Sequence, residues 1–124
     1  MKLSEAIRLG AMNSPQIKGG YMDGEGRCAL SAACDAAGIG SVEALHGGRR
    51  VLDYPKLEET FPLLAKYVCP PGTTSTTDEV QMIIWSLNDY NGWTREQIAD
   101  WVETIENQQE QEQAPAAELV AVKI

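Results

Sequence analysis

The stretch LNDYNGWTREQIADWVETIE, Leu87 to Glu106, decides the fold. Thr94 and Gln97 have the spacing of a capping box, in which each side chain bonds the other residue's backbone N–H at a helix start. Asn91-Gly92, just before it, tolerates the left-handed backbone with which a preceding helix ends. Apolar residues then recur at helical spacing: Ile98, Trp101, Val102 and Ile105. The stretch therefore predicts a turn followed by an amphipathic helix.

A second helix is predicted immediately before this turn. Thr76 and Glu79 form another capping-box pattern, and apolar residues follow at i, i+3, i+4 and i+7: Val80, Ile83, Ile84 and Leu87. Together the two helices predict a helix-turn-helix hairpin. Four charged residues lie away from the apolar face of its second helix: Arg95, Glu96, Asp100 and Glu103.

The first half of the chain predicts two more helices. Residues 4–12 carry one apolar face, with Ser4 as the N-cap. The segment RCALSAACDAAGIG is rich in alanine, the best helix former, and Gly38 is a natural helix stop. Because its side chains are so small, this helix can approach its neighbours closely, and we place it at the centre of the bundle.

Helical signals between residues 41 and 66 are weaker. Ser41 is expected to cap a short helical turn, and Arg50–Leu52 is the one strand-like piece. Pro55 suits the first position of a helix. Pro62 lies inside the following helical pattern, where it either kinks one helix or starts another.

We therefore predict an all-α fold, a small irregular bundle of four to six short helices that ends in the hairpin. Residues 1–106 form its single domain, and residues 107–124 form a flexible low-complexity tail that is disordered or a frayed helical extension. Whether the last seven residues, ELVAVKI, dock as a strand stays open. The predicted core is Leu3, Ile7, Cys28, Leu30, Ala33, Leu45, Phe61, Leu64, Ile83, Ile84, Leu87, Trp93, Ile98, Trp101 and Ile105.

Composition narrows the function. The 124 residues carry a net charge of −8, which opposes binding to nucleic acid or anionic membrane. No apolar run approaches the roughly 20 residues that span a bilayer, and the N-terminus is a poor signal peptide. An odd number of cysteines, three, fits reduced thiols better than a disulfide framework. We expect a cytoplasmic protein that binds neither nucleic acid nor membrane.

The hairpin suggests calcium binding or DNA reading, but its residues argue against both functions. An EF-hand loop placed on Asp89, Asn91 and Gly92 would need carboxylates where Leu87 and Ile98 stand. A DNA-reading helix needs basic side chains, whereas WTREQIADWVETIE carries one arginine against four acids. Phosphate repulsion would dominate.

Metal and cofactor sites are not expected either. Cys28 and Cys34 fall on different faces of one helix, Cys69 lies beside two prolines, and His46 is in a separate loop. No two of them have the short spacing of paired zinc ligands. We predict that the protein folds without metal and holds no cofactor.

The candidate binding residues are Arg27, Asn88, Asp89 and Trp93. Asn88-Asp89 is also explained by an Asx turn at a helix end. We predict a non-enzymatic module that binds another protein and assign no catalytic residue. The alternative is a small enzyme that uses the polar loop residues around Arg27, Cys28, His46 and Asp89, which would have to meet in space.

Three blocks carry a resemblance: MKLSEAIRLGAM, RCALSAACDAAGI and LNDYNGWTREQIADWVETIE. They resemble a group of small uncharacterised bacterial and phage-associated proteins with a KLSEAIRLG start, a Cys-Ala-Leu-Gly-Ala-Ala type helix and a closing LND-x-x-x-WTREQIADWVE block. The chain departs from that pattern at Ser31, where glycine is expected, and in residues 67–91, where relatives can carry additional Cys and His. The resemblance implies one helical unit and a bacterial or mobile-element origin, and no activity.

Overall fold

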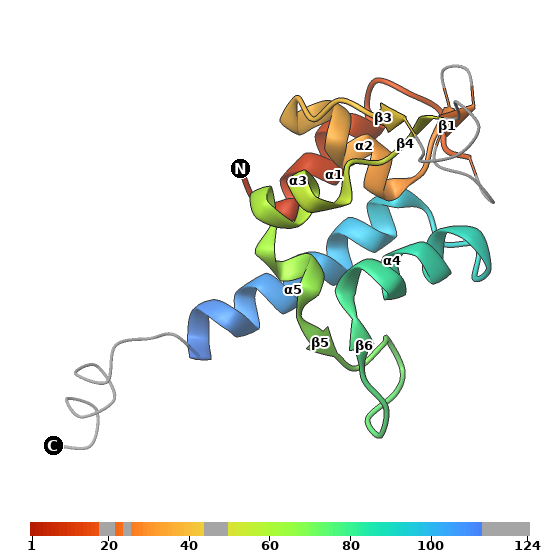
Figure 1. The fold of residues 1–124 in the computed structure, drawn as a ribbon. Helices are drawn as coiled ribbons and strands as arrows, with labels where there is room; N and C mark the ends of the chain where they lie inside the picture. Colours follow the sequence, from red (N-terminus) through yellow and green to blue (C-terminus); the bar gives the residue numbers. More distant parts are fainter. Residues whose placement is uncertain (18–21, 24–25, 44–49, 113–124) are drawn as a thin grey trace, which may run out of the picture.

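The computed structural model describes residues 1–17, 22–23, 26–43 and 50–112, and within them the chain is mostly helical (Figure 1). Its helices are α1 (Leu3–Ala11), α2 (Ala29–Ala37), α3 (Tyr54–Thr60), the 3-10 helix η1 (Pro62–Ala65), α4 (Val80–Asp89) and α5 (Arg95–Glu112). The predicted helical fold class is confirmed at this level.

Short strands that the all-α prediction did not include lie between the helices. Three antiparallel pairs of two-residue strands are present in the described part of the chain: β1 (Met22–Asp23) with β2 (Gly26–Arg27), β3 (Val42–Glu43) with β4 (Arg50–Val51), and β5 (Tyr67–Val68) with β6 (Asp78–Glu79). The last pair projects from the bottom of the bundle in Figure 1. The expected helical turn after Ser41 is wrong at Val42–Glu43, because these residues pair with β4.

The tightest contact in the core is between α1 and α2. Ala29, Ala32 and Ala33 are fully buried, as the predicted central position of this helix requires. Gly10 of α1 lies directly against the backbone of Ala32, since a Cβ added at Gly10 would come within 1.9 Å of the Ala32 carbonyl oxygen. The two helices can therefore approach this closely only because position 10 has no side chain.

Several predicted helix boundaries are confirmed. The Thr94 amide donates to Gln97 Oε1 at 2.9 Å and the Gln97 amide donates to Thr94 Oγ1 at 3.1 Å, which is a complete capping box. Gly38 ends α2 with a positive φ of 73°. Pro62 starts η1 after α3 has ended at Thr60, so it separates two helices rather than kinking one.

The second predicted capping box is wrong. Glu79 belongs to β6 together with Asp78, and α4 begins only at Val80. The Glu79 amide, which the Thr76 side chain was expected to bind, donates to Asp78 Oδ1 at 2.8 Å. The next amide, that of Val80, donates to the Lys66 carbonyl at 2.9 Å.

The start of α1 is held by the last helix instead of by a local cap. Ser4 is buried and is not the N-cap, because the helix begins at Leu3. Its amide donates to Glu106 Oε2 at 3.2 Å and its hydroxyl to Glu106 Oε1 at 2.5 Å. A carboxylate at this position compensates the positive end of the helix dipole.

Helix α5 continues to Glu112, past the boundary drawn at residue 106, so residues 107–112 are a helical extension. Residues 113–124, with the ELVAVKI segment, lie outside the described residues. Three acids of α5 that lie away from its apolar face bind Arg8 of α1: Glu96 at 3.2 Å, Asp100 at 2.7 Å and Glu103 at 3.2 Å. Hydrogen bonds to Asp100 and then Glu103 raise the pKa of Arg8.

The predicted core is buried except at its tryptophans. Trp93 and Trp101 are only partly buried and pack against the core from outside. Leu45 lies outside the described residues.

Candidate functional site

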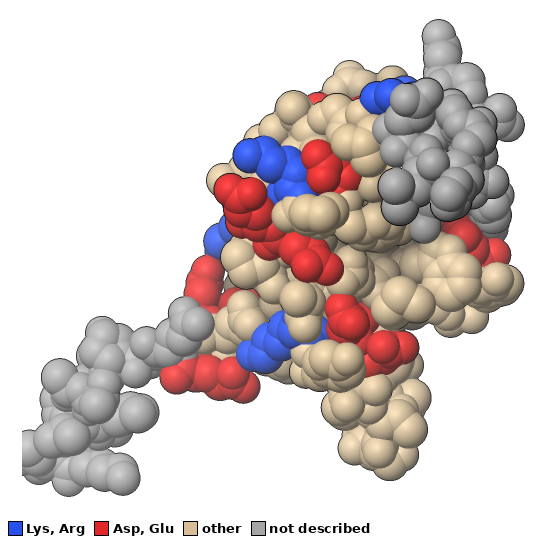
Figure 2. Space-filling model, viewed as in Figure 1, with Lys and Arg blue, Asp and Glu red and all other residues tan. Residues whose placement is uncertain are grey.

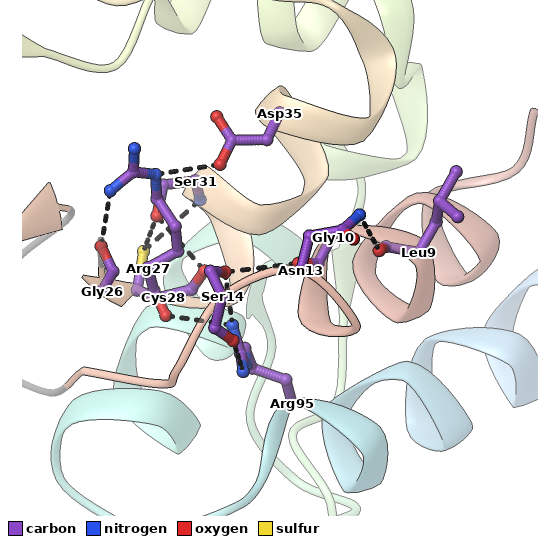
Figure 3. A network of polar contacts seen from close by, with 10 residues as sticks. All are labelled: Leu9, Gly10, Asn13, Ser14, Gly26, Arg27, Cys28, Ser31, Asp35 and Arg95. Carbon is purple, nitrogen blue, oxygen red and sulfur yellow. Dashed lines mark hydrogen bonds and ion pairs between the residues drawn. The ribbon is translucent and has the colours of Figure 1, made fainter.

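Arg95, which was placed away from the apolar face of its helix, is the centre of a buried polar network (Figure 3). Only 8% of its surface is exposed. Its guanidinium donates to the Ala11 carbonyl at 3.3 Å, to the Ser14 carbonyl at 2.5 Å and hydroxyl at 3.1 Å, and to the Arg27 carbonyl at 3.5 Å. Burial lowers the pKa of Arg95 from its usual value, and the nearby Cys28 opposes that shift. Arg95, the first residue of α5, thereby links the end of α1 to β2, the strand before α2.

Asn88 is the centre of a second group of buried hydrogen bonds. It is 1% exposed, and its amide group makes four hydrogen bonds. The oxygen accepts from Gln16 Nε2 at 2.9 Å and from the Ala29 amide at 3.3 Å, the first amide of α2. The nitrogen donates to the Ile17 carbonyl and to Asp89 Oδ1, both at 2.8 Å. The predicted local Asx turn is therefore not what orders Asn88, which instead joins three segments of the chain.

These contacts join three of the four candidate binding residues, Asn88, Asp89 and Trp93. Asp89 accepts from Asn88, and the Gln16 side chain donates to the Trp93 carbonyl at 2.8 Å as well as to Asn88. Arg27 donates to Asp35 Oδ2 at 2.9 Å and to the Gly26 carbonyl at 2.8 Å. The hydrogen-bonding groups of Asn88 are all used within the protein, so this network holds segments together, and the binding role of the four residues stays a prediction.

Cys28, the cysteine of the enzyme alternative, and Cys34 of the same segment are both buried. Cys28 is buried at the start of α2, where its sulfur accepts from the Ser31 amide at 3.4 Å. Burial, followed by the proximity of Cys28, Asp35 and Asp53, raises the pKa of the Cys34 thiol to about 12, so Cys34 is a protonated thiol at neutral pH. His46 lies outside the described residues.

No group of three or more His, Cys, Asp or Glu in the described part of the chain could hold a metal ion. No helix in that part of the chain is long and apolar enough to cross a membrane.

A cavity of about 310 Å³ lies where α1 starts, between Lys2, Phe61, Leu63 and α5. Both acids that line it are bound within the protein. Glu106 accepts hydrogen bonds from Ser4, and Lys2 Nζ lies 2.7 Å from Glu110 Oε1. The cavity therefore offers an incoming ligand apolar walls and two acids that already have partners.

The outward face of α4 is different, because large apolar side chains lie on it. Met82 is 45% exposed and Tyr90 is 71% exposed. The ring of the partly buried Trp85 packs edge-on against Tyr90, with ring centroids 5.1 Å apart. Figure 2, viewed as Figure 1, shows the surface over α4 as largely uncharged, with acidic side chains at its borders. Met and aromatic residues are enriched where proteins bind one another. We call Met82, Trp85 and Tyr90 the α4 face.

Two cavities flank the α4 face, and Met82 lines both. One, of about 240 Å³, is lined by Leu30, Tyr54, Gln81, Met82 and Trp85. The other, of about 110 Å³, is lined by Pro70, Asp78, Met82, Ile83, Ser86, Leu87 and Asn91. Sequence reasoning missed this face because it followed the apolar stripe on the opposite side of α4.

Comparison of the chain with models of protein families, with curated proteins and with solved structures found no match in any of the three. What the protein does is therefore argued from its own surface.

Proposed function

We propose that the protein is a small acidic, non-enzymatic interaction module that binds another protein through the α4 face. One observation carries the proposal: a flexible methionine and two aromatic side chains lie together on one helix, with a cavity on each side of the methionine. Methionine adapts its shape to a partner, and a cavity gives an apolar anchor somewhere to insert. The net charge of −8 adds a preference for a basic partner.

We propose that α4 and α5 act together as a helix-turn-helix hairpin that presents protein-binding side chains. Its first helix carries the α4 face, and the capping box at Thr94 and Gln97 orients the second. The second helix is joined to α1 through Arg8 and Ser4. This attachment leaves the outer side of α4 accessible while its inner side stays in the core.

The test is affinity capture from the protein's own host with quantitative mass spectrometry. Met82→Asp places a charge at the centre of the α4 face without touching the core. We expect it to lower recovery of the partner by about tenfold or more, the equivalent of about 1.4 kcal/mol of binding free energy. Met12→Asp is the matched control, since Met12 is 80% exposed at the end of α1 and does not line the two cavities.

Equal recovery of every captured protein by Met82→Asp and by the unchanged chain would contradict the proposal. Circular dichroism of both variants establishes that each keeps the helical fold, so that a loss of capture reports on the surface alone.

A further inference from the structure

The larger cavity beside Met82 has the size of a side-chain pocket. At about 240 Å³ it is smaller than the roughly 300–1,000 Å³ of sites that enclose drug-sized ligands or cofactors. Leu30 forms buried apolar lining, and Tyr54 and Trp85 contribute aromatic rings. Such a cavity can take one long side chain whose stem is apolar.

Two carboxylates that do not themselves line this cavity meet at Gln81, which does. Gln81, which lines it, donates through the same nitrogen to Glu58 Oε1 at 2.7 Å and to Glu79 Oε2 at 2.6 Å. Glu58 comes from α3 and Glu79 from β6, so the fold places two like charges around one neutral amide. Each carboxylate has about four acceptor positions, of which Gln81 fills one.

These charges are not neutralised within the described part of the chain, where no Lys or Arg nitrogen lies within 4.0 Å of either carboxylate. The nearest cations in sequence have other partners. Lys56 pairs with Glu59 at 4.0 Å, and Lys66 pairs with Glu112 at 3.5 Å. An apolar aromatic pocket with a pair of unneutralised acids at its edge is complementary to a side chain with an alkyl stem and a positive end.

We propose that this pocket receives an arginine or lysine side chain from the bound protein. The inference rests on the proposed function and specifies the chemistry of the partner. The alkyl stem packs against Tyr54, Met82 and Trp85, and the charged end bonds Glu58 and Glu79. Arginine suits the site best, because a guanidinium can bond two carboxylates at once and also stacks on aromatic rings.

The second cavity can receive another side chain of the same partner. It lies on the other side of Met82, is lined by Ile83 and Leu87, and has Asp78 at its edge. At about 110 Å³ it can take a smaller apolar side chain. The partner segment therefore has an apolar residue close to its basic residue, and rotation of Met82 adjusts the spacing between the two cavities.

The test uses the full chain and two capped pentapeptides in an NMR titration. The first is Ala-Leu-Arg-Leu-Ala, and the second carries citrulline, which has nearly the shape of arginine and no charge. The reporters are the indole N–H of Trp85 and the side-chain NH₂ of Gln81. We expect the arginine peptide to shift both signals and to bind about tenfold more tightly than the citrulline peptide.

A pair of variants isolates the carboxylates. Glu58→Gln with Glu79→Gln keeps the shape of the pocket and should remove the preference for arginine. Glu59→Gln makes the same kind of charge change one residue away, on an exposed side chain of α3, and should preserve the preference.

Three results would overturn the inference: equal binding of the two peptides, a preference that survives in the Glu58/Glu79 variant, or no shift of Trp85 and Gln81 with either peptide. None of these results tests the proposed function, which is tested separately by the capture experiment on Met82→Asp. Equal binding with shifts of Trp85 would identify an apolar pocket that does not select charge.

Discussion

Gly10→Ala should destabilise the protein by about 3 kcal/mol, at the upper end of the range for overpacked cores. The new Cβ would lie 1.9 Å from the Ala32 carbonyl oxygen and 2.4 Å from its carbon. Backbone atoms of a buried helix cannot rotate aside as a side chain can, so α1 and α2 must separate. The separation also pulls on Ser4, which α5 holds through Glu106. The expected readout is a melting temperature lower by about 10 °C.

Gly40→Ala is the control for this prediction. An added Cβ there meets nothing within 4 Å, and its φ lies outside the left-handed region. Alanine at such a position restricts the unfolded chain and stabilises by up to about 1 kcal/mol. Alanine also favours helix over glycine by about 1 kcal/mol, so a Gly10→Ala protein as stable as the unchanged chain would show that α1 and α2 do not meet this closely.

Arg95→Met should lower the free energy of unfolding by about 4 kcal/mol. A loss this large occurs only when a mutation disrupts specific buried interactions. Methionine keeps the apolar stem and removes every donor. The carbonyls of Ala11, Ser14 and Arg27 then lose the guanidinium that binds them in the interior. An unsatisfied buried polar group costs about 1–3 kcal/mol, and the three acceptors do not add fully because water can enter. Urea unfolding measures the loss.

The control for Arg95→Met is Lys56→Met, which also replaces a cation by methionine. Lys56 is exposed and lies 4.0 Å from Glu59, so the change should cost less than about 0.5 kcal/mol. A similarly small cost for Arg95→Met would mean that water can hydrogen-bond the carbonyls of Ala11, Ser14 and Arg27 in place of the guanidinium. Arg95 would then not be what joins α5 to the end of α1.

Local signals made part of the fold predictable. Thr94 with Gln97, Gly38 and Pro55 each act within a few residues of their own position, and each marks a helix end that the structure contains. Apolar spacing likewise identified the buried faces of the helices. These features could be read from the sequence because the interactions that produce them are short in sequence.

The residues that sequence reasoning misplaced act over long distances in the chain. Arg95 was placed away from the apolar face of its helix, yet its acceptors come from residues 11, 14 and 27. Asn88 was interpreted as a local turn residue, although it bonds Gln16, Ile17 and Ala29. Thr76 was expected to cap α4, but β5 pairs with β6 and displaces that cap. Such partners become visible only when the segments are placed in space.

The sequence contains one signal from which the α4 face could have been predicted. Met82 and Trp85 are three residues apart, on the side of the helix opposite Ile83, Ile84 and Leu87. Large apolar residues off the core stripe of an amphipathic helix indicate a binding surface or a second layer of packing. The neighbouring carboxylates Glu58 and Glu79 could not be found in this way, because they come from α3 and β6.

Photo-cross-linking in the host tests the central claim most directly. Benzoyl-phenylalanine placed at position 82 samples the α4 face, and the same group placed at position 12 samples the end of α1. The account predicts that irradiation joins a protein partner to the chain at position 82 and not at position 12. Cross-linking to that partner from position 12 and not from position 82 would show that the protein binds through another surface and would contradict the account.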